Sequence, residues 1–407
     1  MMRGDTAGPR VSVPAPDIGI AIVGAGTMAG AHSAALTMLG PLYPALPLRP
    51  RLVGVSDVNE RLATSIAGRF GYERVDDDWR RLIESADVDL VVACLPPILN
   101  REVVLAAAAA GKHVVSEKPL AESAETAAEL LAACRSAGVF HGLGAAYRWT
   151  PALRAIRGLI ERGELGEVRS LQASFMLDYA ADPDVPLLWR FRKSLAGGGI
   201  AIDTGYHLVD CARFLVGEIE TVQSLTSIFI AERSLPGRDA IGNRGGDADP
   251  SAERGRGPVD VEDAAAALVT FSSGAYGVLE TSRVAIGKRV SLRIEVFGSI
   301  GSAAWDLESP DEFRVCLPGE SSTFGYRRVL VNASHPGATE VLIAGTDGTS
   351  IGWLGQECIM WAEFLSAIAE GRPAHADFVD GVRANAVIDA IYASALSGQR
   401  TAVVEMA

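Results

Sequence analysis

The segment Gly24-Ala25-Gly26-Thr27-Met28-Ala29-Gly30 stands between an apolar run at 18–23 and a stretch with helical spacing. Gly24 permits a tight turn, Gly26 lets the backbone approach a pyrophosphate, and Ala29 is small enough for close helix–strand packing. The N-terminus of the helix then favours phosphate charge through its free amides and its dipole. The pattern predicts a dinucleotide-binding turn, although a simple glycine turn has the same appearance.

A carboxylate follows the second apolar run, where an adenosine ribose would lie. Asp57 ends the run at 52–56, and there it can hydrogen-bond both ribose hydroxyls. It follows Gly24 by more than the usual ~20 residues, and the proline-rich segment 40–50, which we expect to be irregular, accounts for the excess. Because Asp57 would face a 2′-phosphate with like charge, we expect NAD in preference to NADP. Alternatively, Asp57 caps the next helix.

Strand-like and helix-like segments alternate as far as residue 143, which predicts a doubly wound parallel sheet. Helices are expected at 28–39, 60–70 and 102–110. From residue 151, longer β-type runs at 168–177, 221–230, 264–271, 276–283 and 290–297, several joined by short glycine turns, predict a mostly antiparallel sheet. The predicted fold class is α/β, with a Rossmann domain followed by an α/β domain that carries a large open-faced sheet. The expected parts are a disordered tail (1–17), the Rossmann domain (18–145), a substrate-binding and oligomerisation domain (146–378) with a mobile loop (236–258), and a C-terminal helix and tail (379–407).

The composition argues against several classes of protein. Lys and Arg total 37 against 50 Asp and Glu, a net charge of -13, so a general nucleic-acid binder is not expected. The five cysteines show no CxxC spacing, which argues against a disulfide framework and a zinc site, and we expect no metal. No signal peptide and no apolar run of ~18 residues is evident. We therefore expect a cytoplasmic protein that acts on a small molecule and has no membrane partner.

A second glycine-rich segment carries candidate catalytic residues. The glycines at 197–199 would let the backbone approach a ligand, and a helix is expected to begin near residue 202. Asp203 and His207 are four residues apart and would share one helical face, and Asp210 is an alternative partner for the imidazole. Oxidation of a carbinol requires removal of its hydroxyl proton, for which histidine is well suited. Lys118 follows a predicted strand and could stabilise the alkoxide. A capping Asp, a structural His and a surface Lys are the alternative readings.

Taken together, these features resemble the glucose–fructose oxidoreductase, inositol dehydrogenase and MocA-like family (Gfo/Idh/MocA) over residues 18–405. The segments that carry the resemblance follow the family's order: GAGTMAGAH, AAGKHVVSEKPLA, GAAYRW, GELGEV, WRF with AGGGIAIDTGYHLVD, VEDAAAALVTFSSGAYGVLETSR, EVFGSIGSAAWDL and DFVDGVRANAVIDAIYASALSGQR.

The resemblance implies a function for each of these sites. It implies that Lys118, Asp203 and His207 form the catalytic set, with His207 as general base in oxidation. It also implies homodimers or homotetramers built on the open sheet. The implied cofactor residues are Gly24, Gly26, Thr27, Met28, Asp57, Leu95, Pro96, Glu117 and Lys118. The implied substrate residues are Tyr147, Arg148, Asp178, Arg190, Asp203 and His207.

Within the family, the chain looks most like levoglucosan- and cyclitol-dehydrogenase-like members, with two departures. Ala146 stands where members usually carry Asn, and Leu177 stands where the levoglucosan type carries Gln before the residue equivalent to Asp178. An apolar site discriminates weakly between hydroxyls. We therefore expect poor activity on levoglucosan and myo-inositol, and better activity on a ring with fewer hydroxyls or an apolar substituent.

The leading hypothesis is an NAD(P)-dependent dehydrogenase that reversibly oxidises a ring hydroxyl of a sugar, anhydrosugar, glycoside or cyclitol. An alternative is NAD-dependent glycoside cleavage through a transient keto-sugar, which the same fold can host. A third possibility is a dinucleotide-binding regulator without turnover, against which the intact Lys118, Asp203 and His207 argue.

Overall fold

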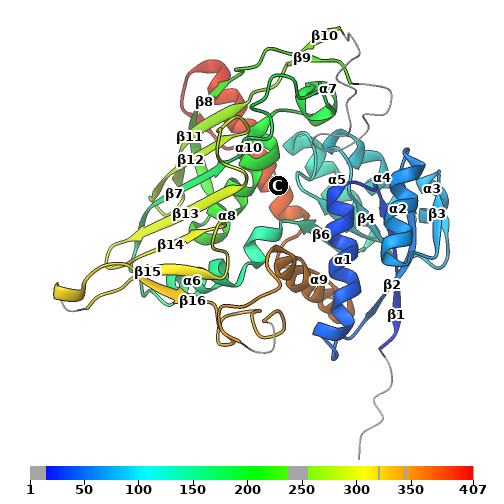
Figure 1. The fold of residues 1–407 in the computed structure, drawn as a ribbon, viewed down its shortest axis with the longest axis horizontal. Coiled ribbons are helices and arrows are strands. Elements are labelled where there is room, and N and C mark those ends of the chain that lie inside the picture. Colours follow the sequence, from blue (N-terminus) through cyan, green and yellow to red (C-terminus); the bar gives the residue numbers. More distant parts are fainter. Residues whose placement is uncertain (1–14, 237–254, 320, 343–345, 407) are drawn as a thin grey trace, which may run out of the picture.

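The computed structural model describes residues 15–236, 255–319, 321–342 and 346–406. Most of the expected tail (1–17) and most of the expected mobile loop (236–258) lie outside the described residues. The remainder forms two large sheets and one two-stranded sheet, with helices between and around the large sheets (Figure 1).

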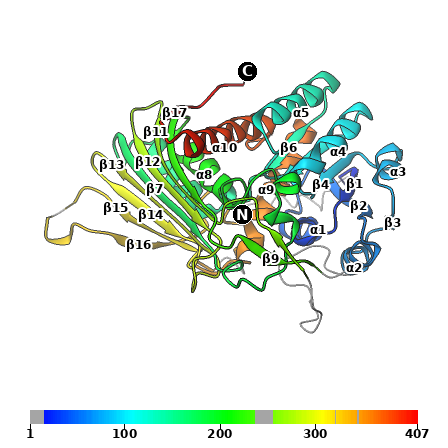
Figure 2. The same cartoon turned by 90° about the horizontal axis from the view of Figure 1, so that it is seen from above.

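The N-terminal sheet has six parallel strands in the order β3-β2-β1-β4-β5-β6. The strands are β1 (Asp17–Val23), β2 (Arg49–Ser56), β3 (Arg74–Asp76), β4 (Leu90–Ala93), β5 (His113–Glu117) and β6 (His141–Gly144). The helices are α1 (Thr27–Leu42), α2 (Glu60–Phe70), α3 (Trp79–Glu84), α4 (Pro97–Ala109) and α5 (Ala124–Ala137). In Figure 2, α1 and α2 lie on one face of this sheet, and α4 and α5 lie on the other. The predicted doubly wound parallel sheet is confirmed.

Two predicted boundaries in this half were wrong. Helix α1 continues to Leu42 and β2 begins at Arg49, so the irregular segment predicted at 40–50 is present but confined to residues 43–48. Pro41 is tolerated because it is one residue from the helix end, where its missing N–H costs a single hydrogen bond. Helix α4 begins at Pro97, five residues before the predicted start, because proline suits the first helical position.

The C-terminal sheet has nine strands in the order β16-β15-β14-β13-β7-β12-β11-β8-β17. Strand β7 pairs with β12 in parallel, whereas the other described neighbours pair antiparallel. The mostly antiparallel sheet is therefore confirmed. Its strands are β7 (Val168–Met176), β8 (Ile219–Ser227), β11 (Ala264–Phe271), β12 (Tyr276–Ser282), β13 (Ser291–Gly298), β14 (Ser302–Asp306), β15 (Glu312–Cys316), β16 (Arg327–Leu330) and β17 (Thr401–Ala402). A separate pair is formed by β9 (Glu232–Ser234) and β10 (Arg256–Pro258).

Helices separate the two sheets. They are α6 (Pro151–Glu161), the short α7 (Lys193–Ala196), α8 (Tyr206–Val216), α9 (Trp353–Glu370) and α10 (Phe378–Ser397). Figure 2 shows α8 and α10 between the sheets, whereas no helix of the described chain lies on the outer face of the nine-stranded sheet. Helix α9 packs against α1 of the N-terminal half, so the C-terminal half supplies part of the cover of the first sheet.

Candidate active site

One cavity of about 930 Å³ opens between the two halves. From the N-terminal half it is lined by the carboxyl ends of β1, β2, β4 and β5, which is where open α/β sheets bind ligands. From the C-terminal half it is lined by β7 and the start of α8. Among the lining residues are most of the predicted set: Gly24, Gly26, Thr27, Met28, Asp57, Leu95, Pro96, Glu117, Lys118, Tyr147, Arg190, Asp203 and His207.

The glycine turn has the geometry that a dinucleotide pyrophosphate requires. Gly24 has φ +93°, and a Cβ there would stand 2.3 Å from the carbonyl oxygen of Cys94, so no larger residue fits. Gly26 is the N-cap of α1, and no side chain caps this helix. An uncapped helix N-terminus at a cavity is an anion-binding arrangement.

Asp57 holds the glycine turn from the end of β2. Its Oδ2 accepts a hydrogen bond from the N–H of Ala25 at 2.6 Å, and its Oδ1 accepts one from Asn59 N–H at 2.7 Å. The N-cap of α2 is Asn59, so the alternative reading of Asp57 as the helix cap is wrong. A carboxylate has about four acceptor sites, so Asp57 retains capacity for ribose hydroxyls.

Two carboxylates that were not predicted from the sequence, Asp77 and Glu102, also line the cavity. Asp77 follows the last residue of β3, an end-of-strand position like that of Asp57, and this was the available indication. Glu102 lies on α4, in the stretch whose start was misplaced. Both are paired with arginines, Asp77 with Arg81 and Glu102 with Arg80, so Asp57 remains the main candidate for the ribose.

Lys118, Asp203 and Arg190 form a charged group at the other end. Lys118 Nζ donates to the carbonyl oxygen of Asp203 at 2.7 Å and lies 3.3 Å from its Oδ1. Arg190 Nε lies 3.5 Å from Asp203 Oδ2. Asp203 therefore fixes the ammonium of Lys118 through both its backbone and its side chain.

His207 lies beside this group in an aromatic surrounding. Its ring contacts Tyr147 edge-on at 4.8 Å and Phe175 at 5.9 Å between ring centroids. Burial lowers the pKa of His207 well below 6.5, and the nearby Lys118 lowers it further, whereas Asp203 opposes the shift. The imidazole is therefore neutral near pH 7 and able to accept a proton, as a general base must.

A π-helical turn, Ala201–Gly205, precedes α8 and carries Asp203. Such turns are rare and occur often at functional sites. The helix was expected to begin near residue 202, and the structure places Asp203 and His207 on the same cavity wall, as the spacing predicted.

The glycine run at 197–199 packs against the protein itself. A Cβ at Gly198 would lie 2.0 Å from the hydroxyl of Tyr392, and one at Gly199 would lie 2.2 Å from the carbonyl oxygen of Glu262. The Glu262 carboxylate accepts hydrogen bonds from Gly199 N–H at 3.1 Å and from Ala201 N–H at 2.9 Å. Gly198 and Gly199 do reach the cavity wall, but this packing already requires glycine, so the run is weaker evidence for a ligand than we expected.

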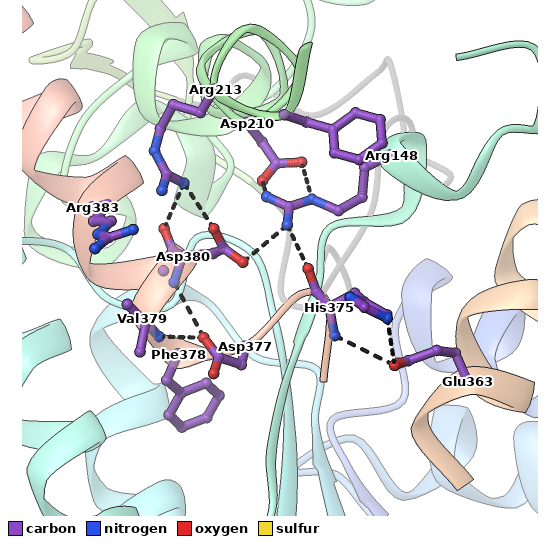
Figure 3. A network of polar contacts seen from close by, with 12 residues as sticks. Arg148, Asp210, Arg213, Glu363, His375, Asp377, Phe378, Val379, Asp380 and Arg383 are labelled. Atoms are coloured by element: carbon purple, nitrogen blue, oxygen red, sulfur yellow. Dashed lines mark hydrogen bonds and ion pairs between the residues drawn. The ribbon is translucent and has the colours of Figure 1, made fainter. Parts of the chain in front are cut away.

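Arg148 and Asp210 do not occupy their predicted positions. Figure 3 shows the Arg148 guanidinium between Asp210 and Asp380, and Arg148 is absent from the described cavity lining. Arg148 Nε donates to Asp210 Oδ2 at 3.1 Å, and Nη1 donates to Asp380 Oδ2 at 2.9 Å. Arg213 Nη1 bonds Asp380 Oδ1 at 3.1 Å. Asp210 is thus committed to Arg148 and does not support His207, and Arg148 ties its turn to α8 and α10.

Asp178 also lies away from the cavity lining. Its Oδ2 accepts from Gly287 N–H at 3.3 Å, and its Oδ1 lies 3.6 Å from Arg289 Nη1. The residues at the two departures, Ala146 and Leu177, do line the cavity.

A buried chain of hydrogen bonds reaches Glu117 from α9. Trp361 Nε1–H donates to His32 Nδ1 at 3.0 Å, which leaves the opposite ring nitrogen to donate to Glu117 Oε1 at 2.9 Å. Glu117 lines the cavity, and its Oε2 accepts from the N–H of Lys118 at 3.1 Å. Helix α9 therefore orients the Glu117 carboxylate, which lines the cavity next to Lys118.

Comparisons with known proteins agree with this geometry. Residues 18–144 match a model described as an oxidoreductase family with an NAD-binding Rossmann fold, and residues 153–304 match a GFO/IDH/MocA C-terminal domain. Levoglucosan dehydrogenase of Pseudarthrobacter phenanthrenivorans is 35% identical over 93% of this chain and 96% of its own. Myo-inositol 2-dehydrogenase of Thermotoga maritima is 30% identical over 76% of this chain and 80% of its own.

Solved structures are similar over nearly the whole chain. Levoglucosan dehydrogenase in complex with NADH has a TM-score of 0.89 at 33% identity, covering 96% of this chain and 100% of that one. An oxidoreductase domain protein from Kribbella flavida has a TM-score of 0.88 at 34% identity, with the same coverage. Among the residues described, no helix is long and apolar enough to cross a membrane, and no group of side chains suited to a metal ion was found.

Proposed function

This chain belongs to the Gfo/Idh/MocA family of NAD-binding oxidoreductases, and from that premise we propose that it oxidises a ring hydroxyl of a sugar, anhydrosugar, glycoside or cyclitol. The observation that carries the proposal is the neutral His207 beside the Lys118–Asp203 pair, in the cavity that also contains the glycine turn. The uncapped α1, Gly24 and Asp57 fit a dinucleotide.

In the proposed reaction, His207 takes the proton of the substrate hydroxyl. The ammonium of Lys118 stabilises the negative charge that develops on the oxygen, and Asp203 holds that ammonium in place. A nicotinamide dinucleotide held by the glycine turn and Asp57 would supply the hydride acceptor. In reduction the same groups work in reverse, with protonated His207 as the acid.

The direct test is a panel of sugars, anhydrosugars, glycosides and inositols with NAD or NADP, followed by NADH absorbance and product analysis. Net accumulation of NADH supports the dehydrogenase. Product without accumulation supports glycoside cleavage through a transient keto-sugar. Binding of NADH without any product would favour a regulator and contradict the proposal.

We expect NAD to give a higher kcat/KM than NADP, by ~10²-fold or more, since like charges placed together cost several kcal/mol. Asp57, at the end of β2, would lie near a 2′-phosphate, whereas Asp77 and Glu102 of the same cavity are paired with Arg81 and Arg80. Asp57→Asn can keep one of the two backbone hydrogen bonds that Asp57 accepts, that from Ala25 N–H, and it removes one charge. It should therefore lower the ratio of kcat/KM for NAD to that for NADP. Asp178→Asn, outside the cavity, is the control. A wild-type preference for NADP would contradict this role of Asp57.

We further propose a homodimer or homotetramer formed through the outer face of the nine-stranded sheet. That face presents Leu225, Leu268 and Tyr276, which are 74%, 56% and 56% exposed on neighbouring strands. Light scattering should give the mass of two or four chains, and Leu268→Lys should lower it. Leu396→Lys, on the exposed end of α10, should not. A monomeric wild type would contradict this assembly.

The five free cysteines support the proposed cytoplasmic location.

A further inference from the structure

The cavity continues beyond the reacting groups along a wall of apolar side chains. Its members, here called the apolar wall, are Phe175, Leu177, Trp189, Val290, Leu307, Pro310 and Trp353. Val290 and Trp353 are 40% and 37% exposed, so large apolar side chains face solvent at the cavity mouth. Apolar side chains that line a concave cavity beside a few polar groups are typical of a small-molecule site.

Strand register shows that the wall is continuous from the catalytic histidine outward. Phe175 contacts His207, and Leu177 is the next residue on the same side of β7. Ser291 pairs with Met176, so Val290 lies opposite Leu177 just past the end of the ladder. One side of the reaction centre therefore leads directly into apolar surface.

The wall then crosses from β13 to α9. Leu307 N–H donates to the carbonyl oxygen of Leu292 at 2.9 Å, which places Leu307 beside β13. Ser350 Oγ donates to Asp311 Oδ1 at 2.5 Å, which brings the start of α9, with Trp353, close to Pro310. A substituent that leaves the reaction centre in this direction would lie mainly against apolar side chains.

This side of the cavity offers few groups that could bind hydroxyls. Arg148 and Asp178 are engaged elsewhere, and Ala146 and Leu177 are apolar. Arg190 Nε lies 3.5 Å from Asp203 Oδ2 and makes no hydrogen bond to the described residues, so this guanidinium can bind a hydroxyl of the sugar ring close to the reaction centre. A fully hydroxylated ring extending along the wall would lose its hydrogen bonds to water without replacing them, which is costly.

We propose that the substrate is a glycoside whose sugar ring presents a hydroxyl to His207 and Lys118 and whose aromatic aglycone lies along the apolar wall. This inference rests on the proposed function and narrows its substrate class. An aromatic ring suits the wall because flat apolar surfaces pack well on Trp and Pro side chains and bury a large area. The apolar wall defines the aglycone, and the experiment below determines the configuration of the sugar.

The test uses matched pairs of methyl and phenyl glycosides in the gluco, galacto, manno and xylo configurations. For each pair we would measure the Kd on the NADH-loaded enzyme by calorimetry, and kcat/KM where turnover occurs. The phenyl member of the best pair should be favoured by ~10-fold or more, because burying its ring removes apolar area from water. If no phenyl member is favoured in either quantity, the inference is overturned.

A near-isosteric variant locates the preference. Leu307→Asn keeps the branched shape of the side chain but makes the wall polar, so the phenyl-to-methyl ratio of kcat/KM or of affinity should fall towards one. Leu396→Asn, which is 91% exposed on the far end of α10, should keep the wild-type ratio. An unchanged ratio in Leu307→Asn would overturn the placement. So would a change in oligomeric mass, because the wall would then be covered by a second copy of the chain.

The two proposals fail in different ways. If no glycoside or sugar yields a keto product, the proposed function fails, whatever the binding ratio. If methyl glycosides or free sugars are oxidised with the same kcat/KM as phenyl glycosides, the proposed dehydrogenase function stands and the proposed aromatic subsite is wrong.

Discussion

Replacing His207 by Ala is expected to lower kcat by ~10²-fold or more, the usual loss when a positioned acid–base group is removed. The imidazole is neutral because burial and Lys118 hold its pKa well below 6.5. The Kd for NADH, measured by fluorescence, should stay near that of the wild type, because the dinucleotide turn lies on the other half of the cavity. Turnover near the wild-type rate would remove His207 from the mechanism.

Lys118→Ala should lower kcat to a similar extent and also change the pH dependence. In the wild type, the rate of oxidation should fall only at pH values well below 6.5, where His207 becomes protonated. Lys118 lowers the pKa of His207 by charge repulsion, so its removal should raise that pKa and move the acid limb of the pH–rate profile upwards. An acid limb that does not move would mean that the Lys118 charge does not reach His207.

Asp210→Ala is expected to destabilise the protein by about 3 kcal/mol or more, since removing one partner of a buried ion pair leaves an uncompensated charge. Arg148 and Asp210 are 6% and 1% exposed, and without Asp210 the buried Arg148 would keep Asp380, which it shares with Arg213. Thermal and urea unfolding would measure the loss. Glu161→Ala, which breaks the exposed Arg157–Glu161 pair, is the matched control and should cost under ~1 kcal/mol.

The same variant separates two roles for Asp210. If the carboxylate only fixes Arg148, the folded enzyme should keep most of its kcat at temperatures below unfolding. A loss of kcat comparable with that of His207→Ala, without a loss of stability, would mean that Asp210 supports the imidazole of His207. That result would contradict its observed pairing with Arg148.

The sequence predicted the fold wherever periodicity and glycine turns were strong. Helix α2 and strand β11 were predicted with their observed bounds, because Asn59 caps one and a short glycine turn ends the other. Strands β15 and β16 were missed, since their short, partly charged sequences resemble loops until they are paired.

The candidate site shows where proximity in sequence misleads. Tyr147 reaches the cavity, but Arg148 follows it on a 3-10 turn, Ala146–Trp149, and points instead to Asp210 and Asp380. Leu177 faces the cavity, and the next residue in an extended chain, Asp178, points to the opposite side. Long-range partners such as Asp380 decide these directions, and no local pattern reveals them.

The contact between α1 and α9 makes the cofactor-binding unit discontinuous along the chain. Ala35 and Leu36 of α1 are 0% and 2% exposed, and α9, more than three hundred residues later, contacts this helix through Trp361 and Cys358. A fragment that stopped after β6 would present this apolar surface of α1 to water and leave His32 without its Trp361 donor. Grafting the unit into another enzyme therefore requires two separate pieces of chain.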